Sequence, residues 1–469
     1  MASRYHPTFP SVRAPEEDRA RPAPEFLRTA VMYQIFLRPF TPEGTLAAAA
    51  ALLPHVASLG IDIVYLCPVT VADDDPRQEF WSGRQVSSRL GNPRNPYRVK
   101  DFFGVDPEYG TAEDLRQFVQ SAHGLGMRVI FDLVYFHCGP GAVFLRDHPE
   151  FVERNAAGEF QVGDWRFPKL DLGNPAVREY LYGNMAYLLT EYGADGFRCD
   201  VGDCLPVGFW EEGRRRLAAI RADGIMLCEG LRGDDQHEAF DFSYGFYTQW
   251  AIRSMLKGEK PAAELQIAWN QEQRDYPRGF RWMRCFDNHD YALDTSMSGG
   301  RFEARFGPLA CDTMLATVFL LNGVPMIYNG QEVADNLPHS IFANRDHGRL
   351  FVNWARALTA VGQKRLKLVR QLTLLRHGNP DLMEGPLAWL ETSRPESVYA
   401  FRRKLATGDL CLVASVLDQQ IEVAVAGVGS GESVLAASGA AVAPARDGCR
   451  WVLPAQGFAI WRESRAGQA

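Results

Sequence analysis

Three carboxylate residues each end an apolar run of this sequence. Asp200 ends GFRCD, Glu229 ends IMLCE and Asp290 ends CFDNHD. If the runs are parallel strands of one barrel, the carboxylates converge at its carboxyl end, and mutual repulsion raises the pKa of at least one of them. One ionised and one protonated carboxyl are the pair that glycoside hydrolysis requires. A single acid at a strand end is more often a helix cap or an ion-pair partner, but three of them favour catalysis.

Cationic and imidazole side chains accompany these acids. Arg198 precedes Asp200 by two positions, so on a strand both side chains share a face, and the guanidinium would keep the carboxylate ionised and oriented. His289 adjoins Asp290, and His137 ends another apolar run. A neutral imidazole can donate a hydrogen bond to a sugar hydroxyl. A lone histidine is more often structural, but two at strand ends beside candidate acids favour contact with a ligand.

A repeated alternation of apolar runs and helical segments would position these residues. Helices are predicted at Thr111 to Gly124, which begins with a T-x-x-D capping box, and at Pro175 to Tyr192, which is followed by glycine. The eight alternations predict an α/β fold, a (β/α)8 TIM barrel. The eight runs are 30–36, 61–68, 128–136, 196–201, 225–230, 239–244, 281–290 and 323–332.

The chain divides into three predicted parts. Residues 1–28 form a polar N-terminal arm, 29–380 the catalytic barrel, and 381–469 a C-terminal antiparallel β-sandwich built from short β runs separated by Gly, Asp and Ser. Two connections after strands, 70–96 and 138–168, are longer than an α/β turn requires. We call 138–168 the inserted segment; it is short for a separate domain. We expect 70–96 to fold over the sugar site and favour short oligosaccharides. The alternative is that Phe80 and Trp81 only pack this loop onto the barrel.

Composition excludes several classes of function. Apolar residues make up 46% and charged residues 23% of 469 residues, which is typical of a globular protein with a large core. The net charge is −7 and no long basic run occurs, so nucleic-acid binding is not expected. No apolar run reaches the length of a membrane span. The nine dispersed cysteines predict buried free thiols in the cytoplasm. The oligomeric state stays open.

Four short motifs then resemble one family. DLVYFH (132–137), GFRCD (196–200), LCEG (227–230) and FDNHD (286–290) are similar, in this order, to the four conserved regions of the α-amylase family, glycoside hydrolase family 13. Segments 95–111, 167–180 and 323–332 also resemble it. The resemblance implies a (β/α)8 barrel with an inserted domain after the third strand and a C-terminal β-domain, the same fold that the run pattern predicts.

The resemblance also implies a role for each candidate residue. Asp200 would be the nucleophile, Glu229 the general acid/base, and Asp290 the carboxylate that binds ring hydroxyls and stabilises the transition state. Arg198, His137 and His289 would line the −1 sugar site. Tyr97 would stack on that sugar, although it could equally pack the long loop.

One departure from the family pattern concerns metal. The first region usually carries an asparagine that binds structural calcium, and here that position is Phe136. Because an aromatic ring cannot supply the hard oxygen that calcium prefers, we expect no calcium site of the usual kind, and no cofactor or catalytic metal.

The sequence therefore predicts a retaining α-glycoside hydrolase whose partner is an α-glucan or a malto- or isomalto-oligosaccharide. A glucosyltransferase or isomerase would use the same covalent intermediate, because the choice of acceptor depends on loop shape. A non-catalytic carbohydrate-binding barrel is disfavoured by the presence of all three acids.

Overall fold

A closed barrel of eight parallel strands forms the centre of the molecule, and the computed structural model describes residues 18–291 and 300–464 of the chain. The strand order around the barrel is β1–β10–β9–β8–β7–β6–β5–β2. Every strand lies inside one of the eight predicted apolar runs, which confirms the (β/α)8 fold. The strands are β1 (Met32–Ile35), β2 (Ile63–Leu66), β5 (Arg128–Leu133), β6 (Gly196–Cys199), β7 (Ile225–Cys228), β8 (Phe242–Tyr244), β9 (Trp282–Arg284) and β10 (Val324–Tyr328).

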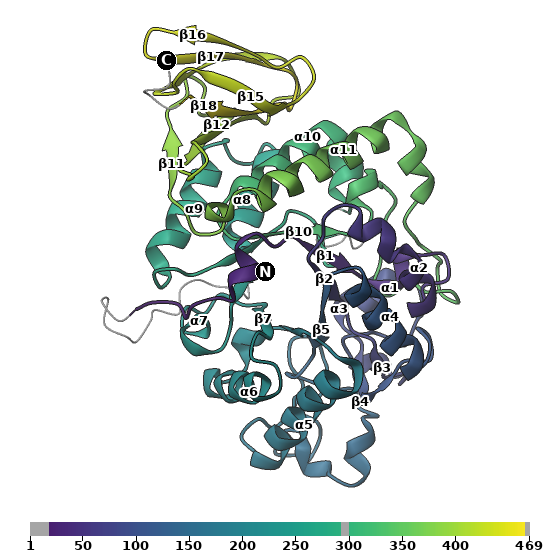
Figure 1. Ribbon diagram of the computed structural model, residues 1–469. Helices are drawn as coiled ribbons and strands as arrows, with labels where there is room; N and C mark the ends of the chain where they lie inside the picture. Colours follow the sequence, from purple (N-terminus) through teal and green to yellow (C-terminus); the bar gives the residue numbers. More distant parts are fainter. Residues whose placement is uncertain (1–17, 292–299, 465–469) are drawn as a thin grey trace.

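Helices surround the barrel strands, which lie at the centre of the catalytic part of the molecule (Figure 1). Every residue of β1, β2, β6 and β7 is buried, because one side of each strand faces the barrel interior and the other faces helices. The helices are α1 (Leu37–Phe40), α2 (Leu46–Ala57), α4 (Ala112–Gly124), α5 (Pro175–Tyr192), α6 (Val207–Ile220), α7 (Asp235–Glu238), α8 (Phe246–Leu256), α9 (Glu264–Asp275), α10 (Phe302–Leu320) and α11 (Ala360–His377). Short 3-10 turns are η1 (Glu25–Arg28), η5 (Gly202–Cys204), η6 (Gln331–Val333), η7 (Trp354–Leu358) and η8 (Pro380–Leu382).

Both predicted helix boundaries are confirmed. At the start of α4, the Asp114 amide donates to the Thr111 hydroxyl and the Asp114 carboxylate accepts from the Thr111 amide, so the capping box is formed. Helix α5 begins at Pro175 and ends at Tyr192, and the following Gly193 has a φ of 71°, a left-handed conformation that glycine adopts at little cost.

The two long connections differ in structure. The first lies between β3 (Thr70–Ala72) and β4 (Val99–Val105), which pair antiparallel, and it contains η2 (Gln78–Phe80) and α3 (Gly83–Ser88). The second follows β5 and contains η3 (Val143–Arg146), η4 (Pro149–Phe151) and isolated bridges such as Val152 with Leu170. The inserted segment is thus small and largely irregular.

The C-terminal part consists of two antiparallel sheets. Val413 of the first sheet shares an apolar core with Val423 and Trp451 of the second, so the sheets pack face to face. This confirms the predicted antiparallel β-domain, while its exact boundary at 380/381 stays a prediction. The first sheet is β11 (Leu387–Leu390), β12 (Val398–Arg403), β13 (Leu410–Ser415), β18 (Phe458–Glu463) and β15 (Gly431–Ala436), and the second is β14 (Ile421–Ala426), β17 (Gly448–Leu453) and β16 (Ala441–Ala445).

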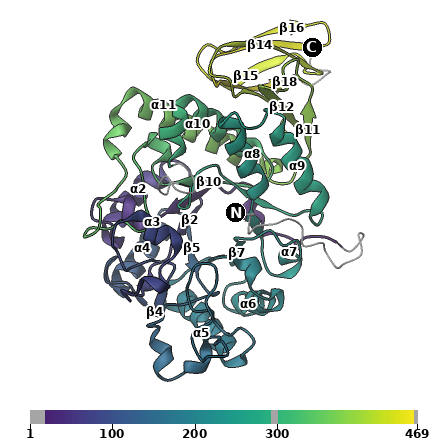
Figure 2. The same ribbon diagram turned by 180° about the vertical axis from the view of Figure 1, so that it is seen from behind.

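The other face of the first sheet packs on the barrel. Tyr399, Phe401 and Leu412 belong to the same apolar core as the barrel strands. The Tyr399 hydroxyl lies 2.5 Å from the Thr317 hydroxyl of α10. Figure 1 and the reverse view in Figure 2 both place this domain beyond α10 and α11, at one end of the molecule.

Two further sequence expectations concern cysteines and membranes. All nine cysteines are free, and only Cys204 is exposed, as predicted for buried thiols. Among the helices described for 18–291 and 300–464, none combines the length and apolarity that a membrane crossing requires.

Candidate active site

Neighbouring barrel strands bring two of the candidate acids side by side. Cys199 at the end of β6 is in register with Cys228 at the end of β7, so the next residues, Asp200 and Glu229, leave the two strands at the same level. The Glu229 amide donates to the Cys199 carbonyl at 3.0 Å, which extends this alignment past the strand ends. Both carboxyls therefore lie at the carboxyl end of the barrel, as predicted.

A single guanidinium links the acids. Arg198 is fully buried on β6, and its Nη1 donates to Asp200 Oδ1 at 2.8 Å and to Asp132 Oδ1 at 2.7 Å. Its Nη2 lies 2.7 Å from Glu229 Oε2. Asp132 is the register partner of Arg198 on β5, so these two side chains project to the same side. Arg198 thus fixes three carboxylates from three adjacent strands.

This cluster carries more negative than positive charge when all its carboxyls are ionised, because one guanidinium faces three acids. Burial raises the pKa of Asp200 well above its usual range and also raises that of Glu229, and Arg198 opposes both effects. The cluster therefore favours keeping a proton on the Asp200–Glu229 pair, and the proton belongs to the pair as a unit. Such a shared proton is what a general acid needs.

The residue after Asp200 has an unusual backbone. Val201 adopts φ 41° and ψ 45°, the left-handed region that a β-branched residue rarely enters. In this conformation its amide donates to Glu229 Oε2 at 2.9 Å. Strain of this kind persists where surrounding contacts impose it and is concentrated at functional sites. Here it aims a backbone donor from the β6 loop at the acid on β7.

A second hydrogen-bonded chain runs from Asp132 to β1. Tyr97 donates its hydroxyl proton to Asp132 Oδ2 at 3.0 Å and lies 2.8 Å from His289 Nε2, while Tyr65 donates to the same oxygen at 2.6 Å. The Gln34 side-chain nitrogen is 2.7 Å from His289 Nδ1. Because Gln34 donates there, the network assigns the ring proton to Nε2.

Burial also sets the charge of His289. It lowers the pKa of this imidazole, so the ring is neutral near pH 7. The ring stacks on Tyr97, with centroids 5.5 Å apart and planes inclined by 16°. Tyr97 itself is almost completely buried. Whether Tyr97 also stacks on a sugar stays a prediction.

Asp290 has a partner from the first long loop. Arg84 Nη1 donates to Asp290 Oδ1 at 2.9 Å, and His289 Nε2 lies 3.4 Å from Oδ2. Burial alone would raise the pKa of Asp290, but His289 and Arg84 outweigh it and hold this pKa below the usual carboxylate range. Asp290 is thus the one of the three acids whose pKa is lowered, and it is ionised near pH 7.

His137 belongs to a different wall of the site. Its ring contacts Phe167 and Trp165 edge-on, with centroids 4.9 and 5.4 Å away. Its backbone forms a bridge with Lys169 of the inserted segment. The structure therefore places His137 against the segment 138–168, and its contact with a sugar stays a prediction.

The residues around Phe136 do not suit calcium. The Phe136 ring packs against Trp165, and the Lys169 ammonium lies 5.7 Å from the ring centroid. Calcium requires several oxygen ligands and no nearby cation. A family-type calcium at this position does not fit the side chains present.

Sequence reasoning missed four residues of this network: Gln34, Tyr65, Arg84 and Asp132. Gln34 and Asp132 are polar residues inside apolar strand runs, and this signal could have identified them because a buried polar group needs a partner. Tyr65 resembles an ordinary core residue in its run. Arg84 lies in a loop, and no sequence pattern connects it with Asp290.

Solved structures share this architecture. A noncanonic maltogenic α-amylase, AmyB, from Thermotoga neapolitana superimposes with a TM-score of 0.73 at 23% identity, covering 92% of this chain and 96% of that one. An α-amylase from Lactobacillus plantarum gives a TM-score of 0.74 at 24% identity, covering 93% and 99%. These likenesses establish the fold.

Curated relatives are similar in sequence. The α-amylase MalA of Haloarcula japonica is 27% identical over 66% of this chain and 45% of its own length. Neopullulanase 2 of Thermoactinomyces vulgaris is 24% identical over 88% of this chain and 72% of its own. The intracellular maltogenic amylase of Bacillus subtilis is 24% identical over 86% and 70%. The match thus spans less than half of the first relative and about 70% of the other two.

The family profile described as "Alpha amylase, catalytic domain" matches residues 28–165 and 157–360, which is most of the chain and includes all the acids described above. Together with the barrel and the acids at its strand ends, this match is decisive: the chain belongs to the α-amylase family of glycoside hydrolases.

Proposed function

We propose that this protein is a retaining α-glycosidase that acts on α-glucans or on malto- or isomalto-oligosaccharides. The observation that carries the proposal is the Arg198 guanidinium, which holds Asp200 and Glu229 on two of its nitrogens at 2.8 and 2.7 Å. The names of the relatives, α-amylase, neopullulanase and maltogenic amylase, support this substrate class.

In the first chemical step, a carboxylate oxygen of Asp200 attacks the anomeric carbon of the −1 sugar. The bond from that carbon to the glycosidic oxygen breaks, and Glu229 transfers its proton to the departing oxygen. The product is a glycosyl ester on Asp200. The shared proton of the Asp200–Glu229 pair supplies the protonation state that this step needs, with Asp200 ionised and Glu229 protonated.

In the second step, water replaces the leaving group. Glu229, now ionised, takes a proton from the water as its oxygen attacks the anomeric carbon, and the ester bond to Asp200 breaks. Two displacements at one carbon retain its configuration. Ionised Asp290 accepts hydrogen bonds from ring hydroxyls, and neutral His289 is oriented beside it.

The neighbouring residues act as positioning groups in this proposal. Asp132 and Tyr97 hold Arg198 and His289 in fixed orientations, and Val201 adds an amide hydrogen bond to Glu229. A rigid set of donors and acceptors stabilises charge in the transition state without reorganisation. The hydrogen bonds described above therefore fix the site residues in place from Gln34 on β1 to His289 after β9.

A glucosyltransferase or isomerase remains the second candidate, because a sugar hydroxyl can replace water in the second step. A non-catalytic barrel is disfavoured, since the acids, their shared cation and the strained Val201 would then have no chemical role.

We place the protein in the cytoplasm. Nine free cysteines, eight of them buried, are typical of a reducing compartment. One of the relatives is named as an intracellular enzyme.

The test is a panel of α-1,4- and α-1,6-linked oligosaccharides and sucrose, with products separated by chromatography. We expect shorter oligosaccharides or glucose from at least one α-glucoside, and no turnover by Asp200→Asn, whose circular dichroism should match the wild type. Products longer than the substrate would favour the transferase. An Asp200→Asn variant that keeps near-normal activity on every cleaved substrate would refute the assignment.

A further inference from the structure

An ion pair joins the first long loop, between β3 and β4, to the segment that follows β9 at the barrel mouth. Arg84, on α3, donates to the Asp290 carboxylate at 2.9 Å, and its other terminal nitrogen lies 3.4 Å from the Asp290 carbonyl. The Arg84 side chain is 24% exposed and that of Asp290 34%, so a ligand can reach both groups. Asp290, which is proposed to bind sugar hydroxyls, is therefore already paired with Arg84 before substrate binds.

The loop that carries Arg84 is held by buried contacts. Fully buried Arg98 donates to the carbonyls of Asp73, Asp75, Phe80 and Pro93 at distances between 2.8 and 3.1 Å. The Trp81 indole donates to the Asp75 carbonyl at 3.0 Å, and Gln85 donates to the Asn92 carbonyl at 2.9 Å. Such a cross-linked loop presents Arg84 in a fixed place.

Barrel topology shows which side of the mouth the loop covers. The loop lies between β3 and β4 in the connection that follows β2, and Asp290 follows β9. Between β2 and β9 on the shorter path around the barrel lie β1 and β10. The loop also contacts the segments that follow β1 and β10, because Arg38 donates to the Arg94 carbonyl at 3.3 Å and Asn92 donates to the Phe342 carbonyl at 2.8 Å. The acids Asp200 and Glu229 lie on the opposite path, after β6 and β7.

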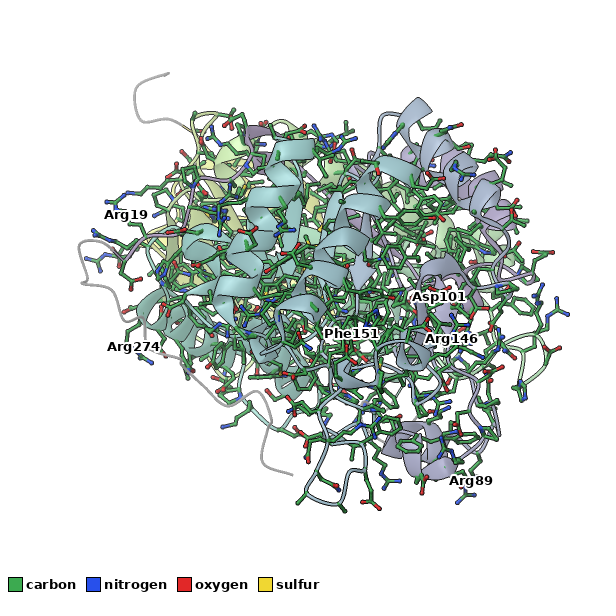
Figure 3. The ribbon with its side chains drawn as sticks, turned by 90° about the horizontal axis from the view of Figure 1, so that it is seen from below. Arg19, Arg89, Asp101, Arg146, Phe151 and Arg274 are labelled. Carbon is green, nitrogen blue, oxygen red and sulfur yellow. The ribbon has the colours of Figure 1, made fainter. Side chains whose placement is uncertain are left out.

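The same loop is also joined to the inserted segment. The Phe80 ring contacts Phe160 with centroids 5.9 Å apart, and the inserted segment in turn packs Trp165 on His137. Figure 3, which views the molecule from below, shows Arg89 at the end of α3 and Arg146 of the inserted segment on one flank, with Arg19 and Arg274 on the opposite one. The two loops are thus in contact with each other, and the Arg84–Asp290 ion pair connects them to the segment after β9.

We propose that Arg84 determines substrate size. By bonding to Asp290 it completes a wall on the β1 and β10 side of the mouth, so that the −1 site accepts the end of a short α-gluco-oligosaccharide and disfavours an internal segment of a long polymer. A polymer that continued past this wall would have to separate Arg84 from Asp290. The proposal rests on the proposed glycosidase function and extends it to the choice between chain ends and chain interiors.

The experiment compares kcat/KM for maltotriose and for soluble starch in the wild type and in Arg84→Ala, Arg84→Gln and Arg84→Lys. We expect the starch-to-maltotriose ratio to rise about tenfold or more in the Ala and Gln variants, which lack the cation. Lysine restores a cation and should return the ratio toward the wild-type value. Arg89→Gln is the matched control: this arginine ends the same helix, and within the described residues its side chain makes no hydrogen bond or ion pair.

Binding supplies a second readout. If an Arg84 variant is too slow for kinetics, the ratio of dissociation constants for maltotriose and starch is measured with Asp200→Asn added to each protein. A ratio that is unchanged from wild type in Arg84→Ala and Arg84→Gln overturns the proposal, as does a ratio that changes equally in Arg89→Gln. If the wild type itself cleaves no α-glucan, the proposed function fails instead, which distinguishes the two claims.

Discussion

Arg198 is the residue on which the charge balance of the site depends. Its single guanidinium contacts Asp132, Asp200 and Glu229, while Asp290 has its own partner in Arg84. The sequence spacing predicted a cation next to Asp200, and the structure confirms the contact. It also shows that Arg198 is shared by three carboxylates. Ionisation of Asp200 therefore costs more free energy than it would if Asp200 were the sole partner of Arg198.

This cost predicts a stability effect at Asp200. Burial raises the pKa of Asp200 above the ordinary 3.8, so the Asp200–Glu229 pair binds a proton more tightly in the folded state than in the unfolded state. Stability therefore falls as pH rises above the ordinary carboxyl range, and asparagine avoids this loss. We expect Asp200→Asn to melt at a higher temperature than wild type, by a margin that grows between pH 4 and pH 7. A margin that shrinks over this range would contradict the shifted pKa.

The strand-end residues could be predicted because each ends an apolar run, and a parallel barrel brings such ends together. The positions of Asp200, Glu229 and Asp290 follow from this rule. The contact of Arg84 with Asp290 could not be predicted, because it depends on how the loop between β3 and β4 folds at the mouth of the barrel. Residue patterns identify the ends of elements, whereas long-range loop contacts depend on packing.

At the scale of elements, the loop between β3 and β4 is the feature that the sequence described least well. The sequence predicts that the loop 70–96 folds over the sugar site, with the alternative that Phe80 and Trp81 only pack it onto the barrel. Trp81 is buried and bonded within its own loop, which supports the packing interpretation for that residue, while Phe80 contacts the inserted segment. Arg98, which the sequence analysis did not single out, organises the loop through backbone carbonyls.

Replacing Arg98 should destabilise this loop strongly. Arg98→Ala removes the donor of the Asp73 and Phe80 carbonyls, and the Asp73 carboxylate loses its cationic partner at 3.2 Å. We expect a loss of about 2 kcal/mol or more in the free energy of unfolding, measured by urea denaturation, with faster proteolysis between residues 73 and 95. Arg77→Ala removes an exposed arginine from the same loop, and we expect a change of about 0.5 kcal/mol or less. Equal losses in both variants would argue against the role of Arg98.

The side chains around the inserted segment allow a prediction of how metal removal affects thermal stability. Because Phe136 and Lys169 occupy the region where the family pattern has a calcium ligand, chelation by EDTA should leave the melting temperature almost unchanged. A large fall in melting temperature that calcium reverses would reveal a site elsewhere in the protein.

At the scale of the whole molecule, one face of the first C-terminal sheet shares an apolar core with the barrel, while its other face packs on the second sheet. Tyr399, Phe401 and Leu412 pack in the same cluster as the barrel strands, so this face of the first sheet is buried only while the barrel is folded. The alternation of β runs predicted these sheets. Their attachment to α10 could not be predicted, because both faces of the first sheet carry apolar side chains.

This shared core predicts cooperative unfolding. Differential scanning calorimetry should show one transition for the full chain, since melting of the β-domain exposes the α10 face of the barrel. The same transition should be observed by far-UV circular dichroism and by tryptophan fluorescence. Two well-separated transitions would show that the sheets and the barrel unfold independently.

The most direct test of the central claim is to trap the covalent intermediate. Glu229→Gln, incubated with α-glucosyl fluoride, should form the glycosyl-enzyme, because fluoride leaves with little help from a proton donor, and should release it slowly without its general base. Peptide mapping by mass spectrometry is expected to find one hexosyl group on Asp200. Rapid release of β-glucose with no labelled peptide, or a label on another carboxylate, would contradict the retaining mechanism and the assignment of Asp200.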